Sequence, residues 1–139
     1  MSEHNRQKVL FLCTHNSARS QMAEGLLRHM SGEAYDVFSA GTEKTFVRPQ
    51  AIKVMAEVGI DISQQKSKTL EQYLQDGFDE VITVCDDANE ACPVFPNAKH
   101  RWHWSFPDPS KAQGTEEEQL QVYTEVRNAI QQKIEQELL

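Results

Sequence analysis

The sequence predicts an α/β fold in which helices cover both faces of a parallel sheet. Two short apolar runs, at 8–13 and 80–85, have the composition of strands that are buried on both sides. Over 17–30 and 48–59, by contrast, apolar residues recur every three or four positions, which is the spacing of amphipathic helices. Strands that alternate with helices along a chain pair in parallel and are covered by those helices.

The N-terminal half supplies two strands and two helices. The strand at 8–13 is stopped by polar turn formers, and the helix over 17–30 ends before a Ser-Gly pair. A second strand is predicted at 35–40, and the glycine that follows marks its end. The helix over 48–59 has Pro49 in its first turn and closes on a glycine.

The C-terminal half supplies two further strands and two further helices. Residues 69–75 predict a short helix, and the β-branched residues of 80–85 predict an interior strand that ends on a cysteine. A last short strand is predicted at 99–104. Thr115 and Glu118 have the spacing of a capping box, which marks the start of a long C-terminal helix.

Length and charge narrow the class of protein. At 139 residues and 39% hydrophobic, the chain is expected to fold as a single domain over 1–139. Its formal net charge of -7 argues against a nucleic-acid partner, since an acidic protein repels an anionic polymer. The sequence has no apolar run of membrane-spanning length, no visible signal peptide and no large apolar surface. We therefore expect a cytoplasmic monomer with no membrane partner.

The loop between the first strand and the first helix carries the strongest chemical signal. Cys13 closes the strand, and Arg19 follows as the helix begins. Small side chains between them let several backbone N–H groups converge at a helix N-terminus, where they bind an anion and favour a thiolate. Arg19 adds a planar fork of donors that suits a phosphate-shaped anion. The predicted anion-binding residues are Thr14, His15, Asn16, Ser17, Ala18, Arg19 and Ser20.

The side chains of this loop support that interpretation and leave one alternative. Asn16 tolerates the positive φ that such a turn often needs, and the hydroxyls of Ser17 and Ser20 can donate to a thiolate. In the plainer alternative, Cys13 packs as a small apolar residue and Arg19 lies on a solvated helix face.

The run CTHNSARSQMAEGLL, which starts at Cys13, resembles the active-site loop of the low-molecular-weight protein tyrosine phosphatase superfamily. Ser39-Ala40-Gly41 and the segment 58–63 are similar to further segments of that superfamily. The resemblance extends from about Lys8 into the C-terminal helix. It implies a three-layer, flavodoxin-like fold with a four-stranded parallel sheet flanked by helices on both faces.

The two other cysteines resemble one branch of that superfamily. Thr83-Val84-Cys85 and Ala91-Cys92-Pro93 are similar to segments of the thioredoxin-coupled arsenate reductases, as are residues 114–118 and 125–127. Two thiols that become one disulfide release the two electrons that convert As(V) to As(III). The resemblance therefore implies arsenate, a mimic of phosphate, as substrate and thioredoxin as reductant, with no cofactor and no metal.

The same resemblance implies a role for each catalytic residue. Cys13 attacks arsenic in the cup that Arg19 completes, and Asp108 protonates the hydroxide that leaves. Cys85 then attacks Cys13, which releases arsenite and leaves a Cys13–Cys85 disulfide. Cys92 attacks Cys85 in turn, and thioredoxin reduces the resulting Cys85–Cys92 disulfide.

Other functions remain open at this point. A phosphatase acting on phosphotyrosine or small phosphate esters would need only Cys13, Arg19 and Asp108. A thiol sensor would bind arsenite or zinc without turnover, although the two distal cysteines are further apart than in usual structural zinc sites. The candidate zinc ligands are Cys85, Cys92, His100 and His103. In the plainest alternative, Cys85 is a core residue, Cys92 an incidental loop thiol and Asp108 a turn former between two prolines.

Two positions of the loop depart from the family pattern. Relatives commonly have glycine where this chain has His15, and many have cysteine where it has Ala18. If position 15 requires a positive φ, a histidine there costs roughly 1 kcal/mol. The alanine removes a competing thiol and leaves the three relay cysteines unchanged.

Overall fold

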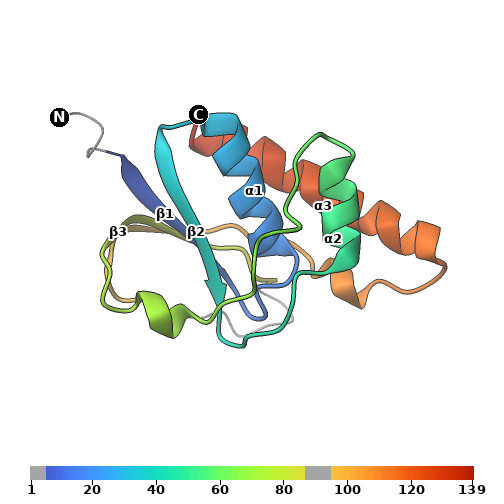
Figure 1. Cartoon of the computed structure of the whole chain (residues 1–139), viewed down its shortest axis with the longest axis horizontal. Helices are drawn as coiled ribbons and strands as arrows, with labels where there is room; N and C mark the ends of the chain where they lie inside the picture. Colours follow the sequence, from blue (N-terminus) through green and yellow to red (C-terminus); the bar gives the residue numbers. More distant parts are fainter. Residues whose placement is uncertain (1–5, 87–94) are drawn as a thin grey trace.

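The structure, a computed structural model, describes residues 6–86 and 95–139. Its strands form one parallel sheet in the order β2-β1-β3-β4 (Figure 1). They are β1 (Gln7–Cys13), β2 (Tyr35–Gly41), β3 (Phe78–Thr83) and β4 (Ala98–His103). The predicted flavodoxin-like α/β class is therefore confirmed, with β1 as an interior strand between β2 and β3.

Three α-helices lie where the sequence predicts them: α1 (Arg19–Ser31), α2 (Pro49–Ala56) and α3 (Glu116–Glu137). Two 3₁₀ helices, η2 (Leu70–Tyr73) and η3 (Pro109–Lys111), complete the described elements. The helix expected over 69–75 is only η2, because so short a segment does not offset the cost of nucleating an α-helix. None of the described helices is long and apolar enough to cross a membrane.

Two clusters of apolar side chains lie on opposite faces of the sheet, because side chains alternate along a strand. Val9, Phe11 and Cys13 join the larger cluster, together with residues of α1, α2 and α3. Leu10 and Leu12 belong to the smaller cluster, against which residues of η2 pack. Both faces of β1 are therefore buried, which accounts for its continuous apolar sequence.

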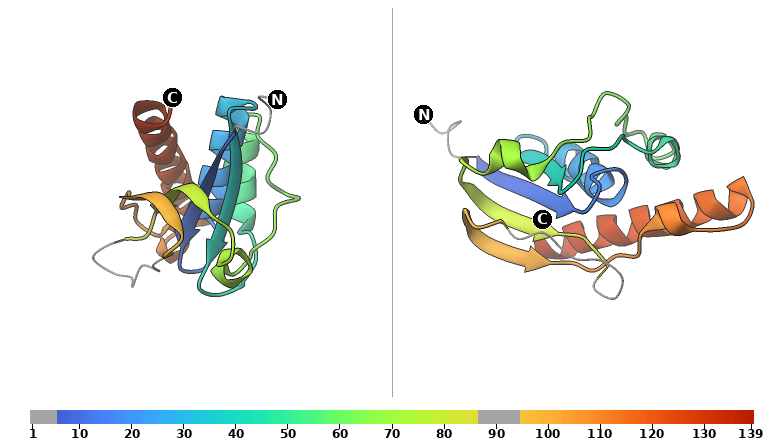
Figure 2. Two further views of the ribbon diagram at one scale, coloured as in Figure 1. Left: turned by 90° about the vertical axis from the view of Figure 1, so that its left-hand side faces the viewer. Right: turned by 90° about the horizontal axis from the view of Figure 1, so that it is seen from below.

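The carboxyl ends of β1 and β3 lie next to each other. β3 ends at Thr83, two residues earlier than predicted, because its partner β4 also ends there, with His103 opposite Thr83. The chain beyond β3 still follows β1, since the Val84 N–H donates to the Leu12 carbonyl at 2.9 Å. Figure 2 shows the N-terminal part of α3, in orange, extending past these strand ends.

Candidate active site

The predicted anion loop connects the end of β1 to the start of α1. Cys13 and Arg19 are each 2% exposed, and Asn16 is fully buried. Asn16 has a φ of 50°, and it is the only non-glycine residue with positive φ in the described ranges. His15 therefore does not have the positive φ that would strain a histidine. The turn places that conformation at Asn16, and asparagine tolerates it. The His15 side chain points to Glu43, with 3.3 Å between Nε2 and Oε1.

The carbonyl groups at the start of the loop have hydrogen-bond partners in other segments of the chain. The Thr14 carbonyl accepts from the backbone N–H of Thr42 at 2.9 Å. The His15 carbonyl accepts from the Thr45 hydroxyl at 2.9 Å and the Ser67 hydroxyl at 3.2 Å. These contacts hold two successive peptide units of the loop from one side.

The next two carbonyls are held in the same way. The Asn16 carbonyl accepts from Nε2 of Gln21 at 3.1 Å, and the Ser17 carbonyl accepts from the backbone N–H of Arg48 at 2.9 Å. Because the C=O and N–H of a planar peptide unit point in opposite directions, outward carbonyls leave the N–H groups turned inward. The loop is thus a cup of backbone donors at the N-terminus of α1, suited to an oxyanion.

Two donors contact the sulfur of Cys13. The Asn16 backbone N–H donates to Sγ at 3.3 Å, and the Ser20 hydroxyl lies 2.9 Å from Sγ. The Asn16 side chain donates from Nδ2 to the Ser20 oxygen at 2.8 Å, which leaves the hydroxyl proton of Ser20 for the sulfur. Hydrogen bonds to the sulfur favour the thiolate. Of the two serines expected to donate, Ser20 has this contact, whereas Ser17 contributes its carbonyl.

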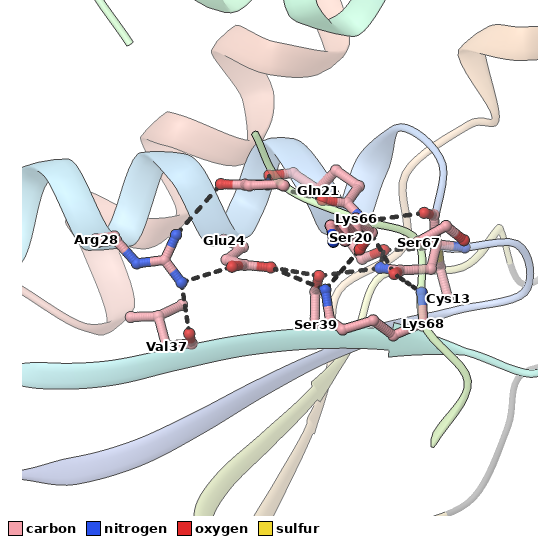
Figure 3. A network of polar contacts seen from close by, with 12 residues as sticks. Cys13, Ser20, Gln21, Glu24, Arg28, Val37, Ser39, Lys66, Ser67 and Lys68 are labelled. Atoms are coloured by element: carbon pink, nitrogen blue, oxygen red, sulfur yellow. Dashed lines mark hydrogen bonds and ion pairs between the residues drawn. The ribbon is translucent and has the colours of Figure 1, made fainter. Parts of the chain in front are cut away.

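A chain of polar contacts leads from this thiol to a buried carboxylate (Figure 3). Nδ2 of Asn16 also donates to the Ser39 hydroxyl at 3.0 Å, and that hydroxyl donates to Oε1 of Glu24 at 2.5 Å. Arg28, one turn further along α1, donates to the other carboxylate oxygen of Glu24 at 2.5 Å. Glu24 is only 6% exposed, so the cup, α1 and β2 are joined through a charged group in the interior.

Arg19 and Asp108 face each other beside the cup. Nη2 of Arg19 lies 3.7 Å from Oδ2 of Asp108, and Nη1 donates to the carbonyls of Phe106 at 3.1 Å and Val84 at 3.5 Å. The other carboxylate oxygen of Asp108 accepts from the backbone N–H of Ser110 at 2.9 Å and from its hydroxyl at 2.7 Å. The segment after β4 therefore brings a carboxyl group, in a fixed orientation, to the guanidinium that completes the cup.

The family model of the low molecular weight phosphotyrosine protein phosphatases matches residues 8–138. The chain belongs to this family. The arsenate reductase of Halalkalibacterium halodurans is 48% identical to it over 130 residues, which cover 94% of each chain.

Solved structures agree with this membership. One described as an arsenate reductase in the phosphate binding state has a TM-score of 0.76 and 34% identity, and covers 94% of this chain and 95% of its own. The thioredoxin-dependent arsenate reductase of Corynebacterium glutamicum has a TM-score of 0.68 and 27% identity, over 94% of this chain and 61% of that chain. These relatives are named for the reduction of arsenate, although the family model is that of a phosphatase.

Of the three cysteines expected to carry such a reaction, the structure describes Cys13 and Cys85. Cys13 and Cys85 are both buried, and both belong to the larger core cluster. Cys85 follows Val84, whose N–H bonds the residue before Cys13, and paired strands lie about 4.8 Å apart. These two thiols of the phosphatase-family chain therefore lie at adjacent strand ends. Cys92 is outside the described residues, and so are its contacts.

The zinc alternative depends in part on Cys92 and is not tested. Within the parts of the chain that the structure describes, no three His, Cys, Asp or Glu residues are grouped as a metal site. Nδ1 of His100 lies 3.1 Å from Glu80, and Nδ1 of His103 lies 2.6 Å from the Thr83 hydroxyl. Both histidines therefore contact side chains of the neighbouring strand β3.

Some residues that hold the phosphatase-family cup were not predicted from the sequence, namely Gln21, Thr42, Thr45 and Ser67. Gly41 also has a specific function at the end of β2. A Cβ there would lie 2.7 Å from the Thr14 carbonyl oxygen, 2.8 Å from that of Cys13 and 2.9 Å from the Asn16 nitrogen. A glycine at a strand end is a known signal of close backbone approach, and it marks this contact.

Proposed function

We propose that this protein is an arsenate reductase that transfers two electrons through Cys13, Cys85 and Cys92 and is regenerated by thioredoxin. The observation that carries the proposal is the pair of buried cysteines at adjacent strand ends, one of which forms the floor of the cup. Oxyanion binding requires only the cup, whereas electron transfer requires a second thiol. The name of the 48% identical relative supports the same reaction.

Substrate binding follows from the donors of the loop. Arsenate is a tetrahedral oxyanion, so inward N–H groups and the Arg19 guanidinium can each donate to its oxygens. The buried position of Arg19 strengthens these contacts, because solvent screens them less. The proposed substrate-binding residues are Thr14, His15, Asn16, Ser17, Ala18, Arg19 and Ser20.

In the first step the Cys13 thiolate attacks arsenic, so that an S–As bond forms as an As–O bond breaks. Asp108 gives its proton to the departing hydroxide, which leaves as water. Cys85 then attacks the sulfur of Cys13. The S–As bond breaks, its electron pair stays on arsenic, and arsenite leaves behind a Cys13–Cys85 disulfide.

In the second step the thiolate of Cys92 attacks the sulfur of Cys85 and frees Cys13 for another cycle. The Cys85–Cys92 disulfide is then reduced by the dithiol of thioredoxin. A third thiol is needed because Cys13 and Cys85 are 2% and 0% exposed, and thiol–disulfide exchange with a protein partner requires access. The thioredoxin-dependent relative from Corynebacterium glutamicum supports this choice of reductant.

Arsenate-dependent oxidation of NADPH, coupled through thioredoxin and thioredoxin reductase, tests the proposal. The wild-type protein should turn over continuously, and Cys13→Ser should be inactive. Cys92→Ser should release at most one arsenite per protein molecule and accumulate the Cys13–Cys85 disulfide, detected by peptide mass spectrometry. Sustained turnover in Cys92→Ser would refute the relay, and no turnover in the wild type would refute the function.

A phosphatase is the second candidate, because the family model that matches the chain is that of phosphotyrosine phosphatases. Such an enzyme would use Cys13, Arg19 and Asp108 and would have no need of a second thiol. It would hydrolyse p-nitrophenyl phosphate at an undiminished rate in a Cys85→Ser variant and show no arsenate-dependent NADPH oxidation. A thiol sensor would bind arsenite and show neither activity.

A further inference from the structure

Lys68 contacts the polar chain between Cys13 and Glu24 at two points (Figure 3). Its backbone N–H donates to Oδ1 of Asn16 at 2.8 Å. Its side chain turns back, so that Nζ donates to the Lys66 carbonyl at 2.6 Å and lies 3.9 Å from Oε1 of Glu24. One residue therefore touches the amide in the loop and the carboxylate in α1.

The contacts of Asn16 indicate the direction of the hydrogen bonds along this chain. Oδ1 accepts from the N–H of Lys68 and, at 2.9 Å, from Nε2 of Gln21, so the amide NH₂ group faces the other way. Its two N–H bonds are directed to the oxygens of Ser20 at 2.8 Å and Ser39 at 3.0 Å. Each serine oxygen is an acceptor in these contacts and keeps its own proton for a second partner.

The second partners are a thiol and a carboxyl group, each of which becomes negatively charged when it loses its proton. The Ser20 hydroxyl is directed to the sulfur of Cys13 at 2.9 Å, and the Ser39 hydroxyl is directed to Glu24 at 2.5 Å. Hydrogen bonds of this kind stabilise a charged acceptor more than a neutral one. The chain therefore directs one hydroxyl proton to the sulfur at one end and another to the carboxylate at the other.

Two cations compensate the carboxylate, and they differ in exposure. The side chain of Glu24 is 8% exposed, that of Arg28 is 49% exposed and that of Lys68 is 20% exposed. Solvent screens a charge less when it is buried, so Lys68 acts on Glu24 with less screening than Arg28. Burial lowers the pKa of Lys68 below its ordinary value, and attraction to Glu24 opposes that shift. Lys68 and Glu24 thus form an ion pair that is mostly shielded from solvent.

We propose that Lys68 is a positioning residue for the Cys13 thiolate and acts through Glu24 and Asn16. Its ammonium group adds to the compensation of the Glu24 carboxylate by Arg28 and so reduces the repulsion between that carboxylate and the thiolate. Its backbone N–H orients the Asn16 amide, which in turn directs the Ser20 proton to the sulfur. The inference rests on the proposed function in taking this thiolate as the nucleophile, but its test requires no arsenate.

The test is the pH dependence of Cys13 alkylation by iodoacetamide, followed on the peptide that contains Cys13 so that other thiols do not contribute. Lys68→Met and Lys68→Gln should lower the rate at pH 7 by about fivefold and move the midpoint of the profile to higher pH. The limiting rate at high pH should stay unchanged, and Lys68→Arg should restore the wild-type profile. Lys66→Met is the matched control, because that side chain is exposed and only the backbone carbonyl joins the chain of contacts.

A wild-type profile in Lys68→Gln would overturn the inference, as would an equal shift in Lys66→Met. Should Lys68→Met fail to fold by far-ultraviolet circular dichroism, the comparison of Lys68→Gln with Lys68→Arg decides the question. Arsenate turnover measured in parallel separates the two proposals. A shifted alkylation profile in a protein that never reduces arsenate would reject the proposed function and support the inference.

Discussion

The hydroxyl oxygen of Ser20 lies 2.9 Å from the sulfur of Cys13. Asn16, whose amide donates to the same oxygen at 2.8 Å, leaves the hydroxyl proton of Ser20 for that sulfur. Ser20 is fully buried in the first turn of α1, so water does not compete for the contact. The serine therefore holds the sulfur of Cys13 through a contact shielded from water.

Replacing Ser20 by alanine should make Cys13 less reactive. A hydrogen bond to a charged group contributes about 1.5–3 kcal/mol, so alkylation at neutral pH should slow by at least tenfold. The rate of iodoacetamide modification of the Cys13 peptide measures the effect. Ser31→Ala, at the opposite end of α1, is the control and should react as the wild type does. Equal rates in Ser20→Ala and the wild type would show that the hydroxyl does not stabilise the thiolate.

Gly41→Ala should damage the cup from the side of β2. A Cβ at this position would lie within 3.0 Å of three backbone atoms of the loop, so the loop must move. Phosphate affinity, measured by isothermal titration calorimetry, should fall by about tenfold or more. Gly77→Ala is the control, since its Cβ would come no closer than 3.8 Å to the Asn97 side chain. Unchanged phosphate affinity in Gly41→Ala would contradict this account.

Substitutions of Asn16 should separate backbone conformation from side-chain bonding. Both Asn16→Ala and Asn16→Gly lose the amide contacts and should lose most of the Cys13 reactivity. Only alanine is strained at a φ of 50°. Urea denaturation should therefore find the glycine variant more stable than the alanine variant by about 0.5–1 kcal/mol. The opposite order of stability would mean that the loop adopts another backbone conformation.

Asp108→Asn should lower arsenate turnover by about 10²-fold or more, as expected when a general acid is removed. Alkylation of Cys13 consumes no proton from Asp108, so its rate at neutral pH should not fall. Ser110→Ala should show a smaller loss of turnover, because it removes one of the two contacts that orient the carboxylate. A parallel loss of alkylation and turnover in Asp108→Asn would assign the residue a structural role instead.

The capping box of α3 should make stability depend on acidic pH. The backbone N–H of Thr115, which donates to the Glu118 carboxylate, holds the pKa of Glu118 below its ordinary value, and the Thr115 side chain adds to this. A carboxyl group whose pKa is lower in the folded state stabilises the fold above its unfolded pKa, and that contribution is lost as the pH falls through the folded value. Glu118→Gln should therefore lower Tm at pH 7 and have almost no effect near pH 3. An equal loss of Tm at both pH values would contradict the ionic origin.

The sequence predicted the position of the loop better than the contacts that support it. Cys13, Asn16 and Arg19 lie within one short segment, so their spacing and the helix start that follows already indicate an anion site. The outer bonds to Thr45 and Lys68 join residues that are far apart in the sequence, and no local pattern reports such pairs. The end of β3 was misplaced for a similar reason, since the strand ends with its partner β4 rather than with its own apolar run.

The outward bonds of the loop carbonyls mean that the cup is complete before any ligand arrives. Phosphate, which matches arsenate in shape and charge, should therefore occupy it with little further rearrangement. The affinities of such a protein for phosphate and arsenate should therefore differ little. Selectivity would then lie in the fate of the bound ion, because arsenic accepts electrons from thiols and phosphorus does not. Under this scheme, the ratio of the two anions in the surrounding solution sets the working rate.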